Sequence, residues 1–423
     1  MRPIPFPCTV IDVAIRFARS AETSMGIPFV RKISKDPSSL FYDSDRAYTR
    51  NYSATRELEA DEFLERASWA PATAKRPWIY HGRNNFEKPD GYKICIGIPS
   101  VRREREQFTG RTIASLLDTL SPEERRLVDL KILLADDAPQ NHPAWQQRWL
   151  HNVADEVLVY GQESSVRTDE HQRITSISRR STIGDDRNKR VQLDYANVIR
   201  ACRRTEADYF ILIEDDVIAS RDWFQRLYKS LEETEARNTG ADWFYLRLFY
   251  SETLLGWNSE EWPVYLRDCI LTYTVVILVV LLVRCRSAVL KPMRSTDLIK
   301  PNVSFILPTL FWVTAYLALY FMAGRLLVDP FRVGVHEMPR YGCCAQGLAM
   351  PRRHLETLEN QLREPPHHLP GDSFVDMVAD QEGLKKWAMV PSVLQHVGVR
   401  GSSERGGYYK TTWNFSFEKG LTG

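Results

Sequence analysis

The sequence shows little imbalance of charge and a low average hydropathy. Its 423 residues include 56 lysines and arginines against 54 aspartates and glutamates, which gives a formal net charge of +2. Without a basic excess, the composition gives no reason to expect nucleic acid as a partner. A mean hydropathy of −0.35 excludes a transporter made mostly of membrane helices. A hydrophobic fraction of 43% is too high for a disordered chain.

Cysteine pairs of the CxxC kind are absent, which argues against a zinc ribbon or a thioredoxin-like site. The seven cysteines are scattered, and their odd number leaves at least one thiol unpaired. Cys343 and Cys344 would contribute to a disulfide in an oxidising compartment, or the cysteines would be small buried thiols. The sequence leaves both interpretations open.

No apolar stretch near the N-terminus is long enough to cross a bilayer or to form the hydrophobic part of a signal peptide. Residues 1–90 mix prolines and charges with short helical stretches, so they are predicted to form a partly irregular N-terminal region. Regular structure is expected to follow it.

From residue 91 onward, short apolar strands alternate with segments of helical spacing. Strands are predicted over 92–99, 130–135, 155–160, 208–213 and 243–249, and helices over 111–120, 191–204 and 221–233. This alternation is typical of an α/β fold with a mostly parallel sheet flanked by helices. Ligands bind such sheets at the carboxyl ends of the strands, where Asp136 and the acidic run 214–216 lie.

Two long hydrophobic runs depart from the average. Residues 303–324 are long enough to span a bilayer, and residues 264–283 are so if Arg267 and Asp268 lie at the interface. The connection between them is basic, with Asp297 against Arg284, Arg286, Lys291, Arg294 and Lys300. The positive-inside rule places this connection in the cytosol and the flanking globular parts on the other side. The alternative is a helical hairpin buried in a soluble core.

The globular pattern resumes after the second hydrophobic run. A helix is expected over 352–362, another begins at 371–374 with Asp372 as its cap, and a strand-like segment leads to His396. We therefore divide the chain into residues 1–90, 91–262, 263–325 and 326–423. The second and fourth parts would form one domain that the hairpin interrupts.

The most informative local pattern is the acidic triplet Glu214-Asp215-Asp216, directly after a predicted buried strand. Adjacent carboxylates repel one another unless a cation neutralises them. Oxygen ligands favour Mg²⁺ or Mn²⁺ held together with substrate phosphates. Extended geometry would point Glu214 and Asp216 the same way. The alternative is a solvated acidic turn that caps the next helix.

Three residues near the C-terminus are candidates to complete the site. A neutral His396 would add a nitrogen ligand to the metal, although a single histidine is more often structural. Asp372 and Asp376 lie four residues apart on one helix face, and one of them would deprotonate an acceptor hydroxyl. The alternative is a helix cap with a solvated face.

Together these residues resemble a known family. Segments 191–195, 210–217 and 394–398 resemble glycosyltransferases of the GT-A fold related to the N-acetylglucosaminyltransferase IV group. A hairpin inside the catalytic domain is similar to that of the Golgi transferases that add N-acetylgalactosamine to GPI anchors after attachment to protein. The resemblance implies a GT-A domain split by an inserted transmembrane hairpin. It also implies a multi-pass protein of the Golgi membrane whose catalytic domain faces the lumen.

The resemblance also implies an activity and its ligands. UDP-GalNAc would be the donor, and a mannose in the glycan of a GPI-anchored protein would be the acceptor, with inversion at the transferred sugar. Mn²⁺ or Mg²⁺ would be held by Glu214, Asp216 and His396. The donor would contact Pro99, Ser100, Arg102, Asp136, Gln192, Asp194 and Asp215. For Arg102, a surface role is an open alternative.

One departure and three alternatives accompany the resemblance. The family carries an N-terminal membrane helix that is not visible here, so the hairpin would anchor the chain alone or the sequence would be incomplete. Another Golgi transferase of N-acetylglucosamine or galactose fits the same motifs. A processive polysaccharide synthase would need Gln-x-x-Arg-Trp, but Trp145 stands where that glutamine belongs. A non-enzymatic scaffold would not need the intact acidic triplet.

Three sequons provide a test of orientation. Asn51 and Asn414 would be lumenal in the implied topology, whereas Asn302 would lie at the cytoplasmic membrane edge and stay unmodified.

Overall fold

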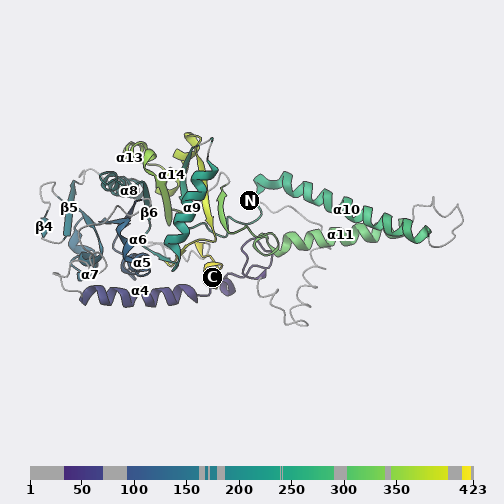
Figure 1. Cartoon of the computed structure of the whole chain (residues 1–423), viewed down its shortest axis with the longest axis horizontal. Coiled ribbons are helices and arrows are strands. Elements are labelled where there is room, and N and C mark those ends of the chain that lie inside the picture. Colours follow the sequence, from purple (N-terminus) through teal and green to yellow (C-terminus); the bar gives the residue numbers. More distant parts are fainter. Residues whose placement is uncertain are drawn as a thin grey trace. The chain divides into compact units, whose positions relative to one another are not determined.

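The structure is a computed structural model, shown in Figure 1. It describes residues 33–69, 93–161, 167–169, 172–178, 186–238, 240, 242–289, 303–338, 344–398 and 412–420. The chain divides into two compact units. One unit, the α/β unit, combines Tyr48–Ser251 with Arg332–Gly423, and the other, the hairpin unit, combines Met1–Ala47 with Glu252–Phe331.

The described part of the α/β unit is built on a ten-stranded sheet. Its strands are β1 (Ile94–Ser100), β2 (Val128–Leu134), β3 (Glu156–Gly161), β4 (Arg167–Asp169), β5 (Gln172–Ser178), β6 (Tyr209–Ile213), β8 (Trp243–Arg247), β9 (Gly334–Glu337), β10 (Gly347–Pro351) and β11 (Lys385–Val390). They follow the order β4-β5-β3-β2-β1-β6-β10-β8-β11-β9. A second, two-stranded sheet pairs β7 (Val217–Ala219) with β12 (Leu394–His396).

The sheet interleaves strands from before and after the hairpin. Strands β1, β2, β3, β5 and β6 are all parallel to one another. The later strand β10 lies antiparallel between β6 and β8. Strand β11 is parallel to β8, and the edge strands β4 and β9 are antiparallel to their neighbours. The predicted α/β fold with a split, mostly parallel sheet is therefore confirmed.

The apolar runs that predicted the central strands are buried because helices cover both faces of the sheet. The helices of the α/β unit are α4 (Tyr52–Trp69), α5 (Thr109–Leu117), α6 (Pro122–Arg126), α7 (Arg148–Val153), α8 (Arg187–Arg203), α9 (Trp223–Arg237), α13 (Leu355–Arg363) and α14 (Gly371–Gln381). Short 3-10 helices cover Pro139–Asn141, Arg352–His354 and Phe417–Lys419. Helix α8 packs on β1 and on α13, whereas α4 packs on α5 and α7 on the other side of the sheet (Figure 1).

Helix α4 belongs to the α/β unit, although the sequence indicated only short helical stretches there. Its Arg56 is fully buried. The guanidinium pairs with Asp118 at 2.7 Å and donates to the carbonyl oxygens of Ser115 and Ala219, both at 3.0 Å. These bonds fasten the helix to α5 and β7, so the α/β unit begins before residue 91.

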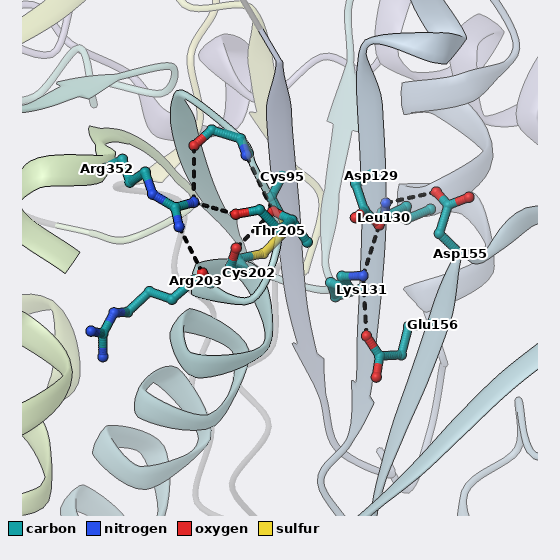
Figure 2. The surroundings of a disulfide bond; sticks show 11 residues. Cys95, Asp129, Leu130, Lys131, Asp155, Glu156, Cys202, Arg203, Thr205 and Arg352 are labelled. Carbon is teal, nitrogen blue, oxygen red and sulfur yellow. Dashed lines mark hydrogen bonds and ion pairs between the residues drawn. A yellow bond between two sulfur atoms is a disulfide. The ribbon is translucent and has the colours of Figure 1, made fainter. Parts of the chain in front are cut away.

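A disulfide joins β1 to α8 at the centre of the unit (Figure 2). Cys95 and Cys202 are 107 residues apart in the sequence, and their Cα atoms lie 5.6 Å apart. Beside it, Arg352 donates to the carbonyl oxygen of Arg203 at 2.9 Å and to that of Thr205, at the end of α8. Cys344 is also disulfide-bonded. Disulfides of this kind persist in oxidising compartments, so the interpretation of small buried thiols fails for these cysteines.

The hairpin unit contains the two hydrophobic runs as long helices. They are α10 (Trp262–Val289) and α11 (Val303–Ala323), accompanied by the short α3 (Ser44–Ala47), α12 (Arg325–Val328) and a 3-10 turn at Ser259–Glu261. Helices α10 and α11 contact each other, and the hydroxyls of Tyr273 and Thr314 lie 2.7 Å apart. Free thiols lie on α10, at Cys269 and Cys285.

Most of the described apolar side chains on these two helices are exposed or half-exposed. Both are long and apolar enough to cross a membrane, and only 0% and 6% of their most hydrophobic windows are buried. Leu282 and Trp312, for example, are 64% and 70% exposed. This exposure disagrees with the alternative of a hairpin buried in a soluble core. The predicted basic residues Lys291, Arg294 and Lys300, with Asp297 and the sequon at Asn302, lie outside the described residues.

Candidate active site

A cavity of about 460 Å³ opens at the carboxyl ends of β1 and β6. The end of β1, helix α8, the acidic triplet after β6, the start of α14 and the end of β12 all contribute to its wall. Of the predicted site residues, the lining includes Pro99, Asp194, Glu214, Asp215, Asp216, Asp372 and His396. Residues far apart in the sequence thus meet at the edge where ligands bind such sheets.

The pairing of β7 with β12 brings His396 to the acidic triplet. In this ladder His396 lies opposite Val217, and the backbone N–H of Val397 donates to the carbonyl oxygen of Asp216 at 2.9 Å. The His396 Nε2 atom consequently lies 3.2 Å from Asp216 Oδ2. One ligand atom each from Glu214, Asp216 and His396 lie within 4.8 Å of one another. The three residues predicted to hold the metal are therefore brought together.

These three residues fit a divalent cation. Asp216 is buried, and its Oδ1 atom has no hydrogen-bond partner among the described residues. The Nδ1 atom of His396 lies 2.9 Å from the Thr412 hydroxyl. If Nδ1–H donates to that hydroxyl, Nε2 keeps the lone pair that a metal needs. Two carboxylates and one imidazole suit Mn²⁺ or Mg²⁺, and the unpartnered oxygen gives such an ion a ready ligand.

The electrostatics of the triplet also favour a cation. Burial raises the pKa of the Glu214 carboxyl to about 8, and the negative charge of Asp216 adds to this effect. Burial would raise the pKa of Asp216 as well, but the positive charges of His396 and Arg103 lower it to about 2. A bound divalent cation would stabilise the charged form of Glu214, because it supplies the counter-charge that this carboxylate lacks.

Arg103 is a site residue that the sequence did not reveal. Its Nη2 atom lies 2.5 Å from Asp215 Oδ1 and 2.9 Å from Asp216 Oδ2. The predicted Arg102 instead has an exposed side chain, and its backbone N–H donates to Asp136 Oδ2 at 3.1 Å. The alternation of side chains in an extended segment could have predicted this residue. Pro99, Val101 and Arg103 are alternate residues, and all three line the cavity.

Asp215 is held by a chain of buried polar groups. The Ser100 hydroxyl donates to Asp215 Oδ2 at 2.6 Å, and His142 Nε2 lies 3.0 Å from Ser100 Oγ. The backbone N–H of Ala144 donates to His142 Nδ1 at 3.1 Å, so the ring proton of the neutral imidazole sits on Nε2 and points to Ser100. Burial lowers the pKa of His142 to about 4. Ser100 therefore acts through Asp215 rather than from the cavity wall.

The low pKa of His142 predicts a loss of stability in acid. Its folded-state pKa lies below the ordinary value of 6.5, so the unfolded chain takes up the proton first. The contribution of this group is present above pH 6.5 and is lost as the pH falls toward 4, by about 2–3 kcal/mol. Urea denaturation of the wild type and of His142→Gln at pH 7 and pH 4.5 measures this. A pH dependence that is equally steep in both proteins would contradict the assignment.

The other predicted donor-side residues occupy different positions. Gln192 is buried outside the cavity, where it donates to the carbonyl oxygen of Leu369 at 2.7 Å and contacts His367 Nδ1 at 2.7 Å. It therefore secures the loop before α14. Asp194 lines the cavity and accepts a hydrogen bond from the Tyr160 hydroxyl. Asp136 is not among the lining residues.

The structure separates the two predicted catalytic aspartates. Asp372 lines the cavity, and its Oδ2 accepts from the backbone N–H of Cys344 at 3.3 Å. Pro370 holds the cap position of α14, so the prediction of Asp372 as the cap is wrong, and Asp372 lies in the first helical turn. Asp376 is not among the lining residues. It pairs with the fully buried Arg247 at 3.0 Å, so its carboxylate is engaged inside the protein rather than exposed to a substrate.

Gln346 is a second lining residue that sequence reasoning missed. It lies just before β10, is 5% exposed, and its Oε1 atom has no partner among the described residues. The sequence carries no signal for it, because only the pairing of β10 with β6 brings it to the triplet.

The sequon at Asn414 is buried, so it does not serve as a test of orientation. Asn414 is 1% exposed, and its amide nitrogen donates to the carbonyl oxygen of Tyr250 and to Ser392 Oγ, both at 2.9 Å. A glycan on this nitrogen is incompatible with that packing. Asn51 is exposed and stays a candidate for modification.

Gly398 provides a test of the geometry around Asp216. A Cβ atom at this position would lie 2.8 Å from Asp216 Cγ and 2.9 Å from its Cβ. Gly398→Ala should therefore displace the carboxylate and weaken binding of Mn²⁺ about tenfold or more, as for other disturbances of metal-ligand orientation. Isothermal titration with Mn²⁺ measures the change. The prediction fails if Gly398→Ala binds Mn²⁺ like the wild type.

Comparison with known proteins gives three findings. Residues 94–395, well over half of the chain, match the family described as GPI-N-acetylgalactosamine transferase PGAP4. The chain is 23% identical over 150 residues to an alpha-1,3-mannosyl-glycoprotein 4-beta-N-acetylglucosaminyltransferase C from Macaca fascicularis. It is 25% identical over 167 residues to a 4-beta-N-acetylglucosaminyltransferase B from Danio rerio. The matched segments cover 34% and 37% of this chain.

The chain spans only 30% and 28% of the lengths of these curated relatives. Among solved structures, a mannosyltransferase from Pyrobaculum calidifontis in complex with GDP-Man and Mn²⁺ is similar over 46% of this chain and 47% of its own. The TM-score is 0.23 and the identity 9%. The extent of the family match confirms the resemblance that the motifs indicated. This chain belongs to the GPI-N-acetylgalactosamine transferase family PGAP4.

Proposed function

We propose that this chain is a membrane-anchored, metal-dependent transferase that moves N-acetylgalactosamine from UDP-GalNAc to a mannose of a GPI glycan, with inversion. The observation that carries the proposal is the partly buried set of Glu214, Asp216 and His396, with its unpartnered carboxylate oxygen, in a member of this family. The set lies at the edge of the sheet where nucleotide ligands are expected.

The proposed metal is Mn²⁺, with Mg²⁺ as the second choice because the mixed oxygen and nitrogen ligands suit Mn²⁺ better. When bound, it would neutralise the charge that develops on the departing diphosphate. Glu214, Asp216 and His396 would hold it. The hydrogen bond from Ser100 would orient Asp215, and Asp215 would help to fix the positions of the neighbouring carboxylates.

Asp372 is the proposed general base. It lines the cavity, is half-buried, and is oriented by the backbone N–H of Cys344. A carboxylate in this position would take the proton from the acceptor hydroxyl as the new bond forms. Direct attack of that hydroxyl on the donor sugar, without a covalent enzyme intermediate, produces inversion. Pro99 and Asp194 would contact the donor from β1 and α8.

A second candidate is a transferase of N-acetylglucosamine or galactose onto another glycan. The similarity to 4-beta-N-acetylglucosaminyltransferases favours it, because those relatives are named for that sugar. The three donors differ at one epimeric centre or one acetamide group, so the same metal and diphosphate contacts serve them all. The donor and acceptor identities require the experiment below.

We propose that α10 and α11 cross the Golgi membrane and that the α/β unit faces the lumen. Exposed apolar side chains on both helices support the membrane crossing. The disulfide between Cys95 and Cys202 supports the lumenal side, because disulfides persist in oxidising compartments. An acceptor tied to a lipid benefits from an enzyme held at the same surface, because anchoring raises its effective concentration.

Glycosidase-sensitive mobility tests the orientation. Modification at Asn51, lost in Asn51→Gln, is the expected result. Modification at Asn302 with none at Asn51 would invert the topology.

The function is tested by incubating the purified full chain with Mn²⁺ and a panel of UDP-sugars, with and without a GPI glycan. Release of UDP from UDP-GalNAc that depends on the glycan is the expected result, with the product linkage read by mass spectrometry. Turnover restricted to UDP-GlcNAc or UDP-galactose would favour the second candidate. An absence of turnover with any UDP-sugar and acceptor would contradict the proposal.

A further inference from the structure

The guanidinium of Arg103 lies almost buried at the acidic triplet, and two of its three nitrogen atoms make no hydrogen bond to the described residues. Its side chain is 10% exposed, and Nη2 alone contacts both Asp215 and Asp216. The Nε and Nη1 atoms have no hydrogen-bond partner among the described residues. One face of the group lies over the Phe108 ring, 5.6 Å from its centre. A buried cation that leaves donors unsatisfied carries an energetic cost and calls for an explanation.

Arg103 and a divalent cation would compete for the same charge. Both would interact with Asp216, whose Oδ2 atom already contacts Arg103 and His396. Adding a metal while Arg103 stays in place would hold two cations against the same carboxylate. A diphosphate brings the negative charge that makes this arrangement favourable. It also offers a planar guanidinium the paired oxygen acceptors that it binds best.

We propose that Arg103 neutralises the triplet in the empty site and turns to the donor diphosphate when metal and nucleotide bind. This inference rests on the proposed function and deepens it, because it assigns a donor ligand outside the predicted site residues. Without metal, the positive charge of Arg103 neutralises carboxylates that the metal would otherwise bind. In the loaded site its two unused donors, Nε and Nη1, bind phosphate oxygens. Metal and nucleotide then bind cooperatively through one side chain.

The backbone around Arg103 is held while its side chain is free to turn. Its N–H donates to Gln107 Oε1 at 3.1 Å, and Gln107 Nε2 donates to the Thr109 hydroxyl at 2.6 Å. The side chain itself donates to no group other than the two aspartates among the described residues. Turning it away therefore costs the contacts to the triplet, which a metal replaces, and the contact with the Phe108 ring.

The test compares Arg103→Ala and Arg103→Lys with Arg66→Ala in the full-length protein. Arg66 is the control because its side chain is 67% exposed on α4 and is not among the residues that line the cavity. Isothermal titration measures two affinities, that of Mn²⁺ alone and that of UDP at saturating Mn²⁺. Thermal unfolding checks that each variant is folded. If Arg103→Ala is unfolded, Arg103→Lys still tests the inference, because it keeps the positive charge.

The two affinities should move in opposite directions. In Arg103→Ala, Mn²⁺ alone should bind more tightly than in the wild type because its competitor is gone. UDP should bind about 10–100-fold more weakly because a charge-assisted contact is lost. Arg103→Lys should lie between, since lysine lacks the paired donors, and Arg66→Ala should match the wild type in both measurements.

A merely structural role for Arg103 predicts a different pattern. Loss of both affinities together in Arg103→Ala, or unchanged binding of UDP, would overturn the inference while leaving the proposed function intact. Failure of the wild type to bind UDP in the presence of Mn²⁺ would instead contradict the proposed function itself.

Discussion

Asp216→Asn should lower sugar transfer by more than about a hundredfold while the protein stays folded, because this residue supplies the unpartnered oxygen of the proposed metal site. The amide keeps the shape of the side chain, so its contact with Gly398 is preserved. It removes the charge that faces His396 and Arg103. Mn²⁺ binding should fall with activity.

Initial rates of UDP release over a range of Mn²⁺ concentrations measure this effect, with circular dichroism as the check on folding. Glu206→Gln serves as the control, since Glu206 is an exposed acid with a single surface pair to Lys93. Activity in Asp216→Asn that survives with the metal chelated would contradict the metal site. A loss that excess Mn²⁺ reverses would support weakened binding.

Asp372→Asn should lower kcat about 10²–10⁴-fold with little change in the binding of UDP, because the acceptor hydroxyl loses its proposed base. The matched comparison is Asp376→Asn on the same helix. That variant leaves Arg247 buried without its carboxylate partner, which should cost about 3–5 kcal/mol of stability. The two aspartates lie on one face of the same helix, but their substitutions should have different effects. Asp372→Asn should lower kcat, whereas Asp376→Asn should lower stability.

Rapid-mixing kinetics and urea denaturation separate these outcomes. The assignment predicts a catalytic defect without loss of stability in Asp372→Asn and loss of stability as the primary defect in Asp376→Asn. A stable Asp376→Asn protein with low kcat, beside a fully active Asp372→Asn, would reverse the roles. Asp372→Glu should recover part of the activity, since it restores the charge at a slightly different position.

Local patterns predicted the central strands because those strands are buried on both faces and read as uninterrupted apolar runs. Strand β6 is the clearest example, as all five of its residues are buried and the acidic triplet follows at its carboxyl end. The two hydrophobic helices could also be predicted, since a run of about 20 apolar residues is typical of a membrane-spanning helix. Helix α4 was harder to predict, because its apolar face is broken by the buried Arg56.

Strand order and pairing lay beyond the sequence. Nothing in residues 347–351 indicates that β10 would enter the sheet antiparallel between β6 and β8. Strands β4 and β5 went unpredicted because their polar residues lack an apolar run. The disulfide was equally hidden, since Cys95 and Cys202 are 107 residues apart and seven cysteines allow many pairings.

The fold class, the acidic triplet, the hydrophobic hairpin and the family could all be predicted from the sequence, because each rests on local residue patterns. Which side chains meet in the cavity depended instead on the tertiary structure. The β7–β12 pairing brings His396 to Asp216, the turn after β1 aims Arg103 rather than Arg102 at the triplet, and α14 turns Asp372 to the cavity while Arg247 holds Asp376. The physical reason is that contacts between distant segments depend on strand register and helix rotation, which local spacing does not encode.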